Sequence, residues 1–247
     1  MLSIIIPCYN EEKNIPLIME RFSRLRKEES FELIVVNNAS TDGTGPVLEL
    51  FQQKPEYDFF RVVNEPIPGY GRAIMAGLRA ATGTVLAWTH ADLQTDPADV
   101  ISAATKLEKE KRRGEGAKLA VKGRRMKRGG IEGWFTLGMG MRASVLLCMK
   151  LWDVNAQPKV FGLEFLALMT NPPGDFSLDL YWLWLAKKHG YTVLTVPVDF
   201  GKRLHGESKS APNLMGKMKT SWRTIKYIFI LMTIGWDTDF PDHQDTP

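Results

Sequence analysis

Residues 85–97 read VLAWTHADLQTDP, an apolar run typical of a buried β-strand that is followed at once by a polar stretch. The same order occurs at residues 3–12, SIIIPCYNEE, and at residues 35–44, VVNNASTDGT. Residues with helical spacing lie between these strands. Such alternation predicts an α/β fold with a mostly parallel sheet and helices on both faces. Ligands bind at the carboxyl ends of the strands in sheets of this kind, and the three polar stretches are expected to meet there.

The same patterns give bounds for the expected elements. We expect strands at Ser3–Ile6, Glu32–Val36, Arg61–Val63, Val85–Trp88, Leu119–Val121 and Thr192–Val198. We expect helices where Ile15, Ile18, Phe22 and Leu25 recur, with Asn10 as the cap, and over residues 47–53, 72–81, 98–111 and 177–189. This order predicts one domain over residues 1–212, an amphipathic helix over 213–236 and an acidic tail over 237–247.

The composition is that of a globular protein, because 44% of the 247 residues are hydrophobic and only 24% are charged. Two cysteines, Cys8 and Cys148, are too few for a disulfide framework and favour a reduced protein. No signal peptide is recognisable, and no apolar run reaches the roughly 18–20 residues that a spanning helix needs. We therefore expect a cytoplasmic protein that can contact the inner face of the cell membrane peripherally.

The net charge of +4 is unevenly spread. Residues 106–130 hold eleven Lys and Arg against three Glu. A basic run of this kind indicates either an anionic partner or a solvated surface. Nucleic acid is not the expected partner, because the sequence lacks the aromatic motifs and the helix-turn-helix pattern of nucleic-acid binders.

Several motifs, taken in order, resemble those of a known family. The stretches SIIIPCYNEEKNI, VVNNASTDGT, GYGRAIMAGLRAATG and ADLQTDP are similar to family 2 glycosyltransferases with the GT-A fold. The later stretches VKGRR, WDVNAQPKVF and FGKRLHGESK resemble the polyprenol-phosphate sugar transferases, the dolichol-phosphate mannosyltransferase group. This resemblance covers about residues 1–210. It implies an inverting, metal-dependent transfer of a sugar from a nucleotide-diphosphate donor to a polyprenyl-phosphate-type acceptor.

The donor diphosphate calls for a hard cation, Mg²⁺ or Mn²⁺, which takes oxygen ligands. Asp92 is the expected metal ligand and catalytic carboxylate, and Gln94 is expected to add its carbonyl oxygen from the same side of an extended segment. The first aspartate of the family's DxD-type motif is His90 here, and the usual Asp-Asp after the second strand is Asn37-Asn38. Because of these departures, the sequence does not identify the base or the sugar of the donor.

Two further groups are candidates for donor contacts. Pro7, Tyr9 and Glu11 match the family's base-contacting loop, and Tyr9 is able to stack on a base, although it can equally pack into the core. Arg72 follows Gly69 at the start of a helix, so its guanidinium and the backbone amides there are able to face phosphate. Packing between helix and strand explains these glycines equally well.

The acceptor side is expected to be basic if the acceptor is a phosphate. Arg124 and Arg125 end the fifth strand, and guanidinium groups bind phosphate in a bidentate manner. The resemblance also points to Lys159, which stands where the family has arginine. A second anion-binding set is expected at Arg203, His205 and Lys209.

Asp179 is expected to act as a catalytic carboxylate. In transfer to a hydroxyl it would be the general base, whereas an anionic phosphate acceptor needs no strong base. A helix-surface acid paired with a basic residue is the alternative.

The last helix carries basic residues among apolar ones that lie near one face. These apolar residues are Leu214, Met218, Trp222, Ile225, Phe229 and Met232. Such a helix can lie on an anionic membrane, on its own domain, or against a second copy in a homodimer.

Two other functions remain open. One is transfer to a sugar hydroxyl in cell-surface polysaccharide or lipopolysaccharide biosynthesis. The other is a nucleotide-sugar binding protein without catalysis.

Overall fold

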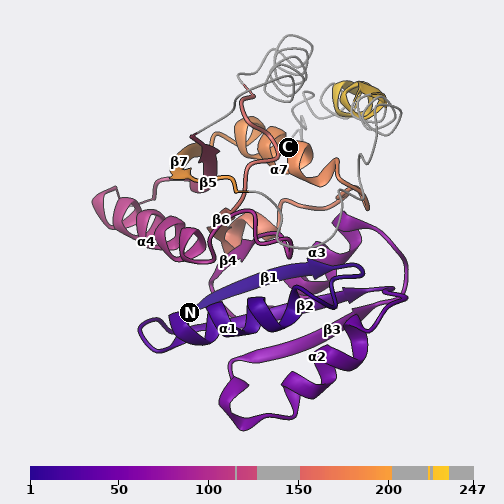
Figure 1. Cartoon of the computed structure of the whole chain (residues 1–247). Helices are drawn as coiled ribbons and strands as arrows, with labels where there is room; N and C mark the ends of the chain where they lie inside the picture. Colours follow the sequence, from indigo (N-terminus) through magenta and orange to yellow (C-terminus); the bar gives the residue numbers. More distant parts are fainter. Residues whose placement is uncertain (115, 127–150, 202–221, 223–224, 234–247) are drawn as a thin grey trace, which may run out of the picture. The chain divides into compact units, whose positions relative to one another are not determined.

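The computed structural model describes residues 1–114, 116–126, 151–201, 222 and 225–233. The chain divides into two compact units, one of residues 1–129 and 153–207 and the other of 130–152 and 208–247. The first unit holds a seven-stranded sheet in the order β3-β2-β1-β4-β6-β5-β7 (Figure 1). Its strands are β1 Leu2–Cys8, β2 Phe31–Asn38, β3 Phe60–Glu65, β4 Val85–Trp88, β5 Leu119–Arg125, β6 Lys159–Gly162 and β7 Thr192–Val198.

Most of the sheet is parallel, as the alternation of strands and helices predicts. Strands β3, β2, β1 and β4 pair in parallel, and so do β5 and β7. Strand β6 runs antiparallel between β4 and β5. Sequence patterns did not predict β6, because its four residues are all buried and a run so short has no measurable period.

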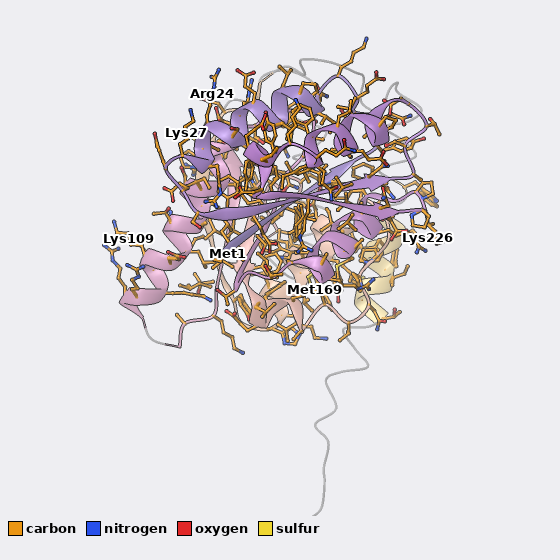
Figure 2. All side chains as sticks on the ribbon, turned by 90° about the horizontal axis from the view of Figure 1, so that it is seen from below. Met1, Arg24, Lys27, Lys109, Met169 and Lys226 are labelled. Carbon is orange, nitrogen blue, oxygen red and sulfur yellow. The ribbon has the colours of Figure 1, made fainter. Side chains whose placement is uncertain are left out.

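Helices cover both faces of this sheet (Figure 2). Helices α1 Ile15–Arg26, α2 Thr44–Gln52 and α4 Ala98–Arg113 share one hydrophobic core with alternate strand residues such as Ile4 and Ile6. Helix α3 Tyr70–Ala80 packs on the opposite face, where Gly77 lies against Ile5. Helix α7 Leu178–Lys188 is buried nearly all round, and its Trp182 meets Trp88 of β4 edge to face at 6.0 Å. The turn η1 Pro55–Tyr57 and the short helix α6 Leu163–Leu166 complete this unit.

Local details differ from the expected bounds. Helix α1 begins at Ile15, after Asn14, so Asn10 does not cap it. The Asn10 side chain instead accepts a hydrogen bond from the backbone N–H of Thr41 at 2.7 Å, which ties two loops together. Helices α2 and α3 begin three and two residues earlier than expected, whereas β7 matches its predicted bounds.

Of the second unit's C-terminal stretch, the structure describes residues 222 and 225–233, which are helical. Ile228 and Leu231 are buried, whereas Trp222, Phe229 and Ile230 are exposed. The predicted tail over 237–247 lies outside the described residues. Among the helices that the structure describes, none is long and apolar enough to cross a membrane.

Candidate functional site

Asp92 lies at the carboxyl edge of the sheet, shortly after β4 ends at Trp88. Its side chain is buried, and Oδ1 accepts a hydrogen bond from the backbone N–H of Gln94 at 3.2 Å. Leu93 between them has a φ of 52°, so the segment turns instead of running extended. The geometric reason for placing Gln94 beside Asp92 was therefore wrong. The Gln94 amide Nε2 donates to the carbonyl of Gly201 at 3.0 Å.

The chemistry of Asp92 fits a cation shared with a substrate. In the described part of the chain, no group of three or more His, Cys, Asp or Glu side chains could hold a metal ion. Magnesium is commonly held by one or two carboxylates together with substrate phosphates. One buried carboxylate at the ligand edge suits this mode, whereas a metal site built from protein ligands alone would need more.

A partly buried polar network lies beside β4 and is centred on the Tyr70 hydroxyl. The hydroxyl lies 3.1 Å from His90 Nε2, accepts from Gln157 Nε2 at 3.2 Å and donates to Asp179 Oδ2 at 3.4 Å. The Tyr70 ring stacks on Phe176, with centroids 4.5 Å apart and planes at 11°. The network joins α3, the loop after β4, the segment before β6 and the first turn of α7.

Asp179 and Lys159 form a buried ion pair at the same place. Lys159 Nζ lies 3.2 Å from Asp179 Oδ1 and donates to the carbonyls of Val154 at 2.9 Å and Ala156 at 2.8 Å. Burial lowers the pKa of Lys159, and the negative charge of Asp179 partly opposes that effect. Because Lys159 is 0% exposed and its three N–H groups have protein partners, the expected direct contact with substrate does not fit this position.

Arg125, at the end of β5, is also paired within the protein. Its Nε and Nη2 atoms donate to Asp153 Oδ1 at 2.9 and 2.6 Å, and its backbone N–H donates to Asp153 Oδ2 at 3.0 Å. The guanidinium lies 5.1 Å from the ring centre of Phe200. Arg124 beside it is exposed. A direct contact between Arg125 and an acceptor therefore stays a prediction, and Arg124 presents its charge outward.

A second buried lysine lies next to Lys159. Lys122 of β5 pairs with Lys159 of β6 across the sheet, and its Nζ donates to the carbonyl of Asp153 at 2.8 Å. Burial, and then the positive charge of Lys159, lower the pKa of Lys122 to about 7. Two buried lysines, Lys122 and Lys159, therefore lie side by side in the sheet. Backbone carbonyls and the Asp179 carboxylate offset part of their positive charge.

The loops after β1 and β2 are joined by hydrogen bonds between their backbones and side chains. The Glu11 N–H donates to Thr44 Oγ1 at 2.8 Å, and the Glu11 carboxylate accepts from Asn14 Nδ2 at 2.6 Å. Pro7 is half-buried, whereas Tyr9 is 40% exposed. Tyr9 thus does not pack fully into the core. The base-contacting role of these residues stays a prediction.

Asn37 and Asn38 have different surroundings. Asn37 is half-buried, and its amide donates to Asn64 Oδ1 at 3.2 Å. Asn38 is buried; its Nδ2 donates to the carbonyls of Glu65 and Ile67 at 3.3 and 2.8 Å, and its Oδ1 accepts from a backbone N–H at 2.7 Å. Asn38 organises the loop between β3 and α3, because both halves of its amide are engaged there.

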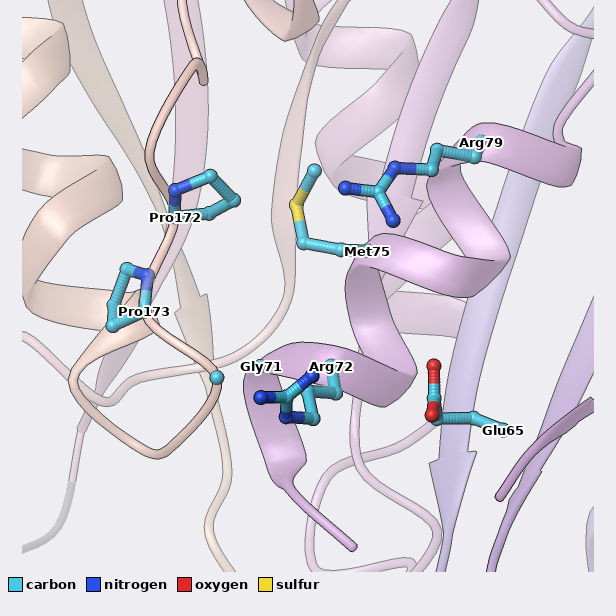
Figure 3. A pocket seen from close by; sticks show the side chains of 8 residues that line it. Glu65, Gly71, Arg72, Met75, Arg79, Pro172 and Pro173 are labelled. Carbon is cyan, nitrogen blue, oxygen red and sulfur yellow. The ribbon is translucent and has the colours of Figure 1, made fainter. Parts of the chain in front are cut away.

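Arg72 lines a pocket between α3 and the Pro172-Pro173 turn (Figure 3). Met75 and Arg79 of the same helix, Glu65 and the Pro172-Pro173 turn complete its walls. The backbone N–H of Arg72 donates to the carbonyl of Gly174 at 3.2 Å, so that amide is not directed at a ligand. A phosphate contact through the Arg72 guanidinium stays a prediction.

Two expected basic groups have different outcomes. Arg203, His205 and Lys209 lie outside the described residues. The basic run over 109–113 forms the last turns of α4, where Lys109 points outward (Figure 2). Three of its members pair with acids, namely Lys111 with Glu164, Arg112 with Glu108 and Arg113 with Glu110. This arrangement is that of a solvated helix surface.

Sequence reasoning missed Tyr70, Gln157, Asp153 and Phe176. Tyr70 and Gln157 lie inside GYGRAI and NAQPK, two motifs that were recognised for their glycines and their lysine. Their contacts join residues up to 109 positions apart. No periodic pattern encodes such pairs, so the local motifs were the only available signal.

Comparisons with known proteins agree with this arrangement. The family model described as Glycosyl transferase family 2 matches residues 3–135, more than half of the chain. An uncharacterized glycosyltransferase of Mycobacterium tuberculosis is 29% identical over 222 residues, which cover 88% of this chain and 93% of that protein. The undecaprenyl-phosphate 4-deoxy-4-formamido-L-arabinose transferase of Photorhabdus laumondii is 33% identical over 101 residues, 40% of this chain and 31% of its own length.

Solved structures share the fold at low identity. The chain is similar to glucosyl-3-phosphoglycerate synthase of Mycobacterium tuberculosis in complex with Mn²⁺, UDP and phosphoglyceric acid, with a TM-score of 0.69 and 20% identity over 98% of this chain and 80% of that one. It is also similar to mannosyl-3-phosphoglycerate synthase of Rubrobacter xylanophilus, with a TM-score of 0.73 and 14% identity over 100% and 78%. These likenesses bear out the predicted GT-A fold.

Proposed function

Because the chain belongs to glycosyl transferase family 2, we propose that it moves a sugar from a nucleotide-diphosphate donor to a polyprenyl-phosphate-type acceptor. The observation that carries the acceptor class is the enclosure of Asp179. The donor half of the proposal depends on Asp92 and on the loops at the carboxyl ends of β1 and β2.

On the donor side, Asp92 would hold Mg²⁺ or Mn²⁺ together with oxygens of the diphosphate. When bound, the cation supplies positive charge that stabilises the leaving nucleotide diphosphate. Solved relatives contain UDP with Mn²⁺ or Mg²⁺, which supports this assignment. Tyr9, 40% exposed at the end of β1, would stack on the base, and Asn37 would offer both a donor and an acceptor to the nucleoside.

On the acceptor side, a hydroxyl acceptor and a phosphate acceptor differ in whether the transfer needs a general base. A sugar hydroxyl must lose its proton as it attacks, so its enzyme requires a carboxylate that can take that proton. Asp179 is 1% exposed, and its two oxygens contact Lys159, Gln157 and Tyr70. A phosphate acceptor is already anionic and needs no such base. It needs cationic groups, of which exposed Arg124 is one candidate.

We infer the following sequence of events for this chain. An oxygen of the acceptor phosphate attacks C1 of the donor sugar from the face opposite the diphosphate, which inverts the configuration at C1. The bond between C1 and the diphosphate oxygen breaks, and the nucleotide diphosphate leaves. Asp92 would hold a cation that supplies positive charge to the leaving diphosphate, while Asp179 orients the polar network of Tyr70 and Gln157. The name of the undecaprenyl-phosphate relative supports the same acceptor class.

One experiment tests both halves. The full chain is incubated with UDP- and GDP-sugars, Mg²⁺ or Mn²⁺, and one of three acceptors: a short polyprenyl phosphate, the matching polyprenol, or a simple glycoside. We expect transfer to the phosphate alone. We expect Asp92→Asn to abolish transfer, whereas Asp96→Asn, an exposed acid nearby, keeps it. Transfer to the polyprenol or to the glycoside would overturn the acceptor class, and donor binding without turnover would favour a binding protein.

A lipid acceptor also predicts a membrane contact. Trp222 and Phe229 are 72% and 55% exposed, and Lys226 between them is exposed as well. Helices with apolar and basic residues of this kind lie on anionic bilayers. We expect binding to vesicles that contain anionic phospholipid, and at least about tenfold weaker binding when Trp222 and Phe229 are both changed to Ala.

Leu50→Ala is the control for vesicle binding, because Leu50 is 60% exposed in the other compact unit. Equal binding of the double variant would contradict the membrane contact. If changing Trp222 and Phe229 to Ala instead weakens a dimer in solution, this surface binds a second copy of the chain. A location on the cytoplasmic face of the membrane belongs to the same proposal.

A further inference from the structure

The pocket between α3 and the turn at residues 172–174, called the α3 pocket below, has no part in the proposed transfer of sugar (Figure 3). Its volume is about 160 Å³. Pockets that hold drug-sized ligands measure roughly 300–1,000 Å³, so the α3 pocket suits a smaller molecule. The residues that line it are Glu65, Gly71, Arg72, Met75, Arg79, Pro172, Pro173 and Gly174.

The turn that forms one wall of the α3 pocket is held tightly against the helix. A Cβ at Gly71 would lie 2.1 Å from the Pro173 carbonyl oxygen, so only glycine allows the turn to come this close. The backbone N–H of Arg72 donates to the Gly174 carbonyl at 3.2 Å. The two consecutive prolines also restrict the backbone, because each ring fixes φ. The pocket is therefore formed before a ligand binds, which lowers the entropic cost of binding.

Two arginines give the α3 pocket its positive charge. Arg72 and Arg79 lie about two turns apart on one face of α3, and Met75 lies between them on that face. Figure 3 shows the side chains of Met75 and Arg79 extending toward Pro172. Among the residues that the structure describes, neither guanidinium has a hydrogen-bond partner or an ion-pair partner, whereas that of Arg125 has both in one aspartate. Both arginines are exposed, so a ligand can reach them.

The chemistry of these walls selects a class of ligand. Glu65 is the one acid among the lining residues, so two guanidinium groups and one carboxylate leave a net positive charge. Guanidinium groups bind phosphate oxygens in a bidentate manner. Met75 is 6% exposed and, with the two prolines, supplies apolar surface beside the arginines. Such a surface suits the carbon part of an organic phosphate better than free phosphate, which has no apolar part to bury.

We propose that the α3 pocket binds a small phosphate monoester. Arg72 and Arg79 hold the phosphate group, and Met75 with the prolines contacts the organic group. This site goes beyond the proposed function and does not depend on it.

The α3 pocket is distinct from the donor site at the carboxyl ends of β1, β2 and β4. The described residues that line it include neither Asp92 nor Tyr9. Tyr70 belongs to the polar network beside β4, and Arg72 follows it by two residues on α3. Two residues along an α-helix differ in direction by about 200°, so the network and the pocket lie on different sides of α3.

Calorimetric titration of the full chain tests the ligand class. The probes are phenyl phosphate and, in a separate titration, inorganic phosphate. We expect phenyl phosphate to bind, and inorganic phosphate to bind about five- to tenfold more weakly because it buries no apolar surface. Equal affinities would overturn the assignment of a monoester, and no binding of phenyl phosphate would overturn the site.

Arg79→Gln tests whether the arginines of the α3 pocket hold the phosphate. We expect the affinity for phenyl phosphate to fall at least about tenfold, because a hydrogen bond between charged groups is lost. Arg112→Gln is the matched control, since Arg112 is an exposed arginine of α4 and does not line the pocket. Its affinity should stay within about twofold of the original. Equal affinities of the two variants would overturn the proposal.

Glu65→Gln tests the sign of the charge on the ligand. The substitution removes the one negative charge of the lining and keeps an oxygen that can accept the hydrogen bond from the Ile67 N–H, now 2.9 Å from Glu65 Oε1. We expect phenyl phosphate to bind about threefold more tightly, because repulsion by the carboxylate is lost. An unchanged or weaker affinity would contradict an anionic ligand beside Glu65.

Competition with UDP and Mg²⁺ tests whether the α3 pocket and the donor site are distinct. We expect the affinity for phenyl phosphate to stay within about twofold in excess UDP with Mg²⁺, and also in Asp92→Asn. An affinity that falls as UDP is added would place the arginines in the donor site and overturn the separate pocket. These titrations need no turnover, so a failure of sugar transfer would contradict the proposed function alone.

Discussion

The Lys159 ammonium lies 3.2 Å from Asp179 Oδ1, and neither residue is more than 1% exposed. The ammonium completes its hydrogen bonds with two backbone carbonyls, while Gln157 and Tyr70 contact the carboxylate. Two opposite charges removed from water in this way depend on each other. Removing one of them leaves the other buried without a counter-charge, which is much more costly than losing a surface ion pair.

Lys159→Met should therefore lower the free energy of unfolding by about 3–5 kcal/mol, because Asp179 would keep its charge or take up a proton in a site built for an ion. Urea unfolding followed by circular dichroism measures the change. Lys187→Met is the control, since Lys187 is an exposed lysine of α7 and should change stability by less than about 0.5 kcal/mol. Equal effects of the two substitutions would argue against a structural ion pair.

Asn38→Asp should destabilise the protein although it restores the family's usual residue. Asn38 donates to the carbonyls of Glu65 and Ile67, and a carboxylate there would face two acceptors without a proton to give. We expect a loss of about 2–3 kcal/mol at pH 7, where the new group is ionised, and a smaller loss near pH 4. Thermal unfolding at the two pH values measures it.

Asn37→Asp provides the comparison for that prediction. Asn37 is half-buried, and its amide partner Asn64 can turn its own NH₂ group toward a carboxylate. Its substitution should cost less than about 1 kcal/mol. A larger loss of stability for Asn37→Asp than for Asn38→Asp would show that the hydrogen bonds of Asn38 are not the reason why asparagine occupies that position.

Local sequence patterns predicted the order of strands and helices. The polar residues at the ends of strands also placed Asp92 and Asn38 at the ligand-binding edge of the sheet. The pattern did not reveal that Lys159 is buried, because burial of a charge depends on a partner twenty residues further along the chain. It did not reveal Tyr70 as the centre of a network for the same reason. Pairings between distant segments come from packing, which periodicity does not record.

Gly123→Ala should disturb both stability and the polar network. A Cβ at Gly123 would lie 1.9 Å from the carbonyl oxygen of Gln157, and the backbone N–H of Gly123 donates to the Pro158 carbonyl at 2.9 Å. The backbone of Gln157 would have to move, and its side chain contacts Asp179 and Tyr70. We expect a loss of about 1–3 kcal/mol in denaturant unfolding.

Gly114→Ala is the control for that substitution, because a Cβ there meets nothing closer than the Ala117 Cβ at 3.7 Å. It should be neutral to within about 0.5 kcal/mol. If Gly123→Ala also changes the free energy of unfolding by less than about 0.5 kcal/mol, the Gln157 carbonyl is not held as close to Gly123 as this contact implies.

Asp99→Asn should stabilise the protein at neutral pH but not in acid. Burial, and then the negative charge of Asp96, raise the pKa of Asp99 from 3.8 to about 6, with a smaller contribution from Asp199. The folded state thus holds this proton more tightly than the unfolded state, so ionisation costs stability as the pH rises from about 4 to about 6. An asparagine keeps an oxygen for the Asp96 N–H and carries no charge.

The gain from Asp99→Asn should be about 1 kcal/mol above pH 6, because solvent around the half-buried carboxyl screens part of the cost, and it should disappear near pH 4. Thermal unfolding from pH 4 to pH 8 measures it, with the exposed Asp58→Asn as a control that should show no such trend. A gain that is the same at every pH would mean that the substitution acts through packing or the helix start, since neither depends on the titration of Asp99.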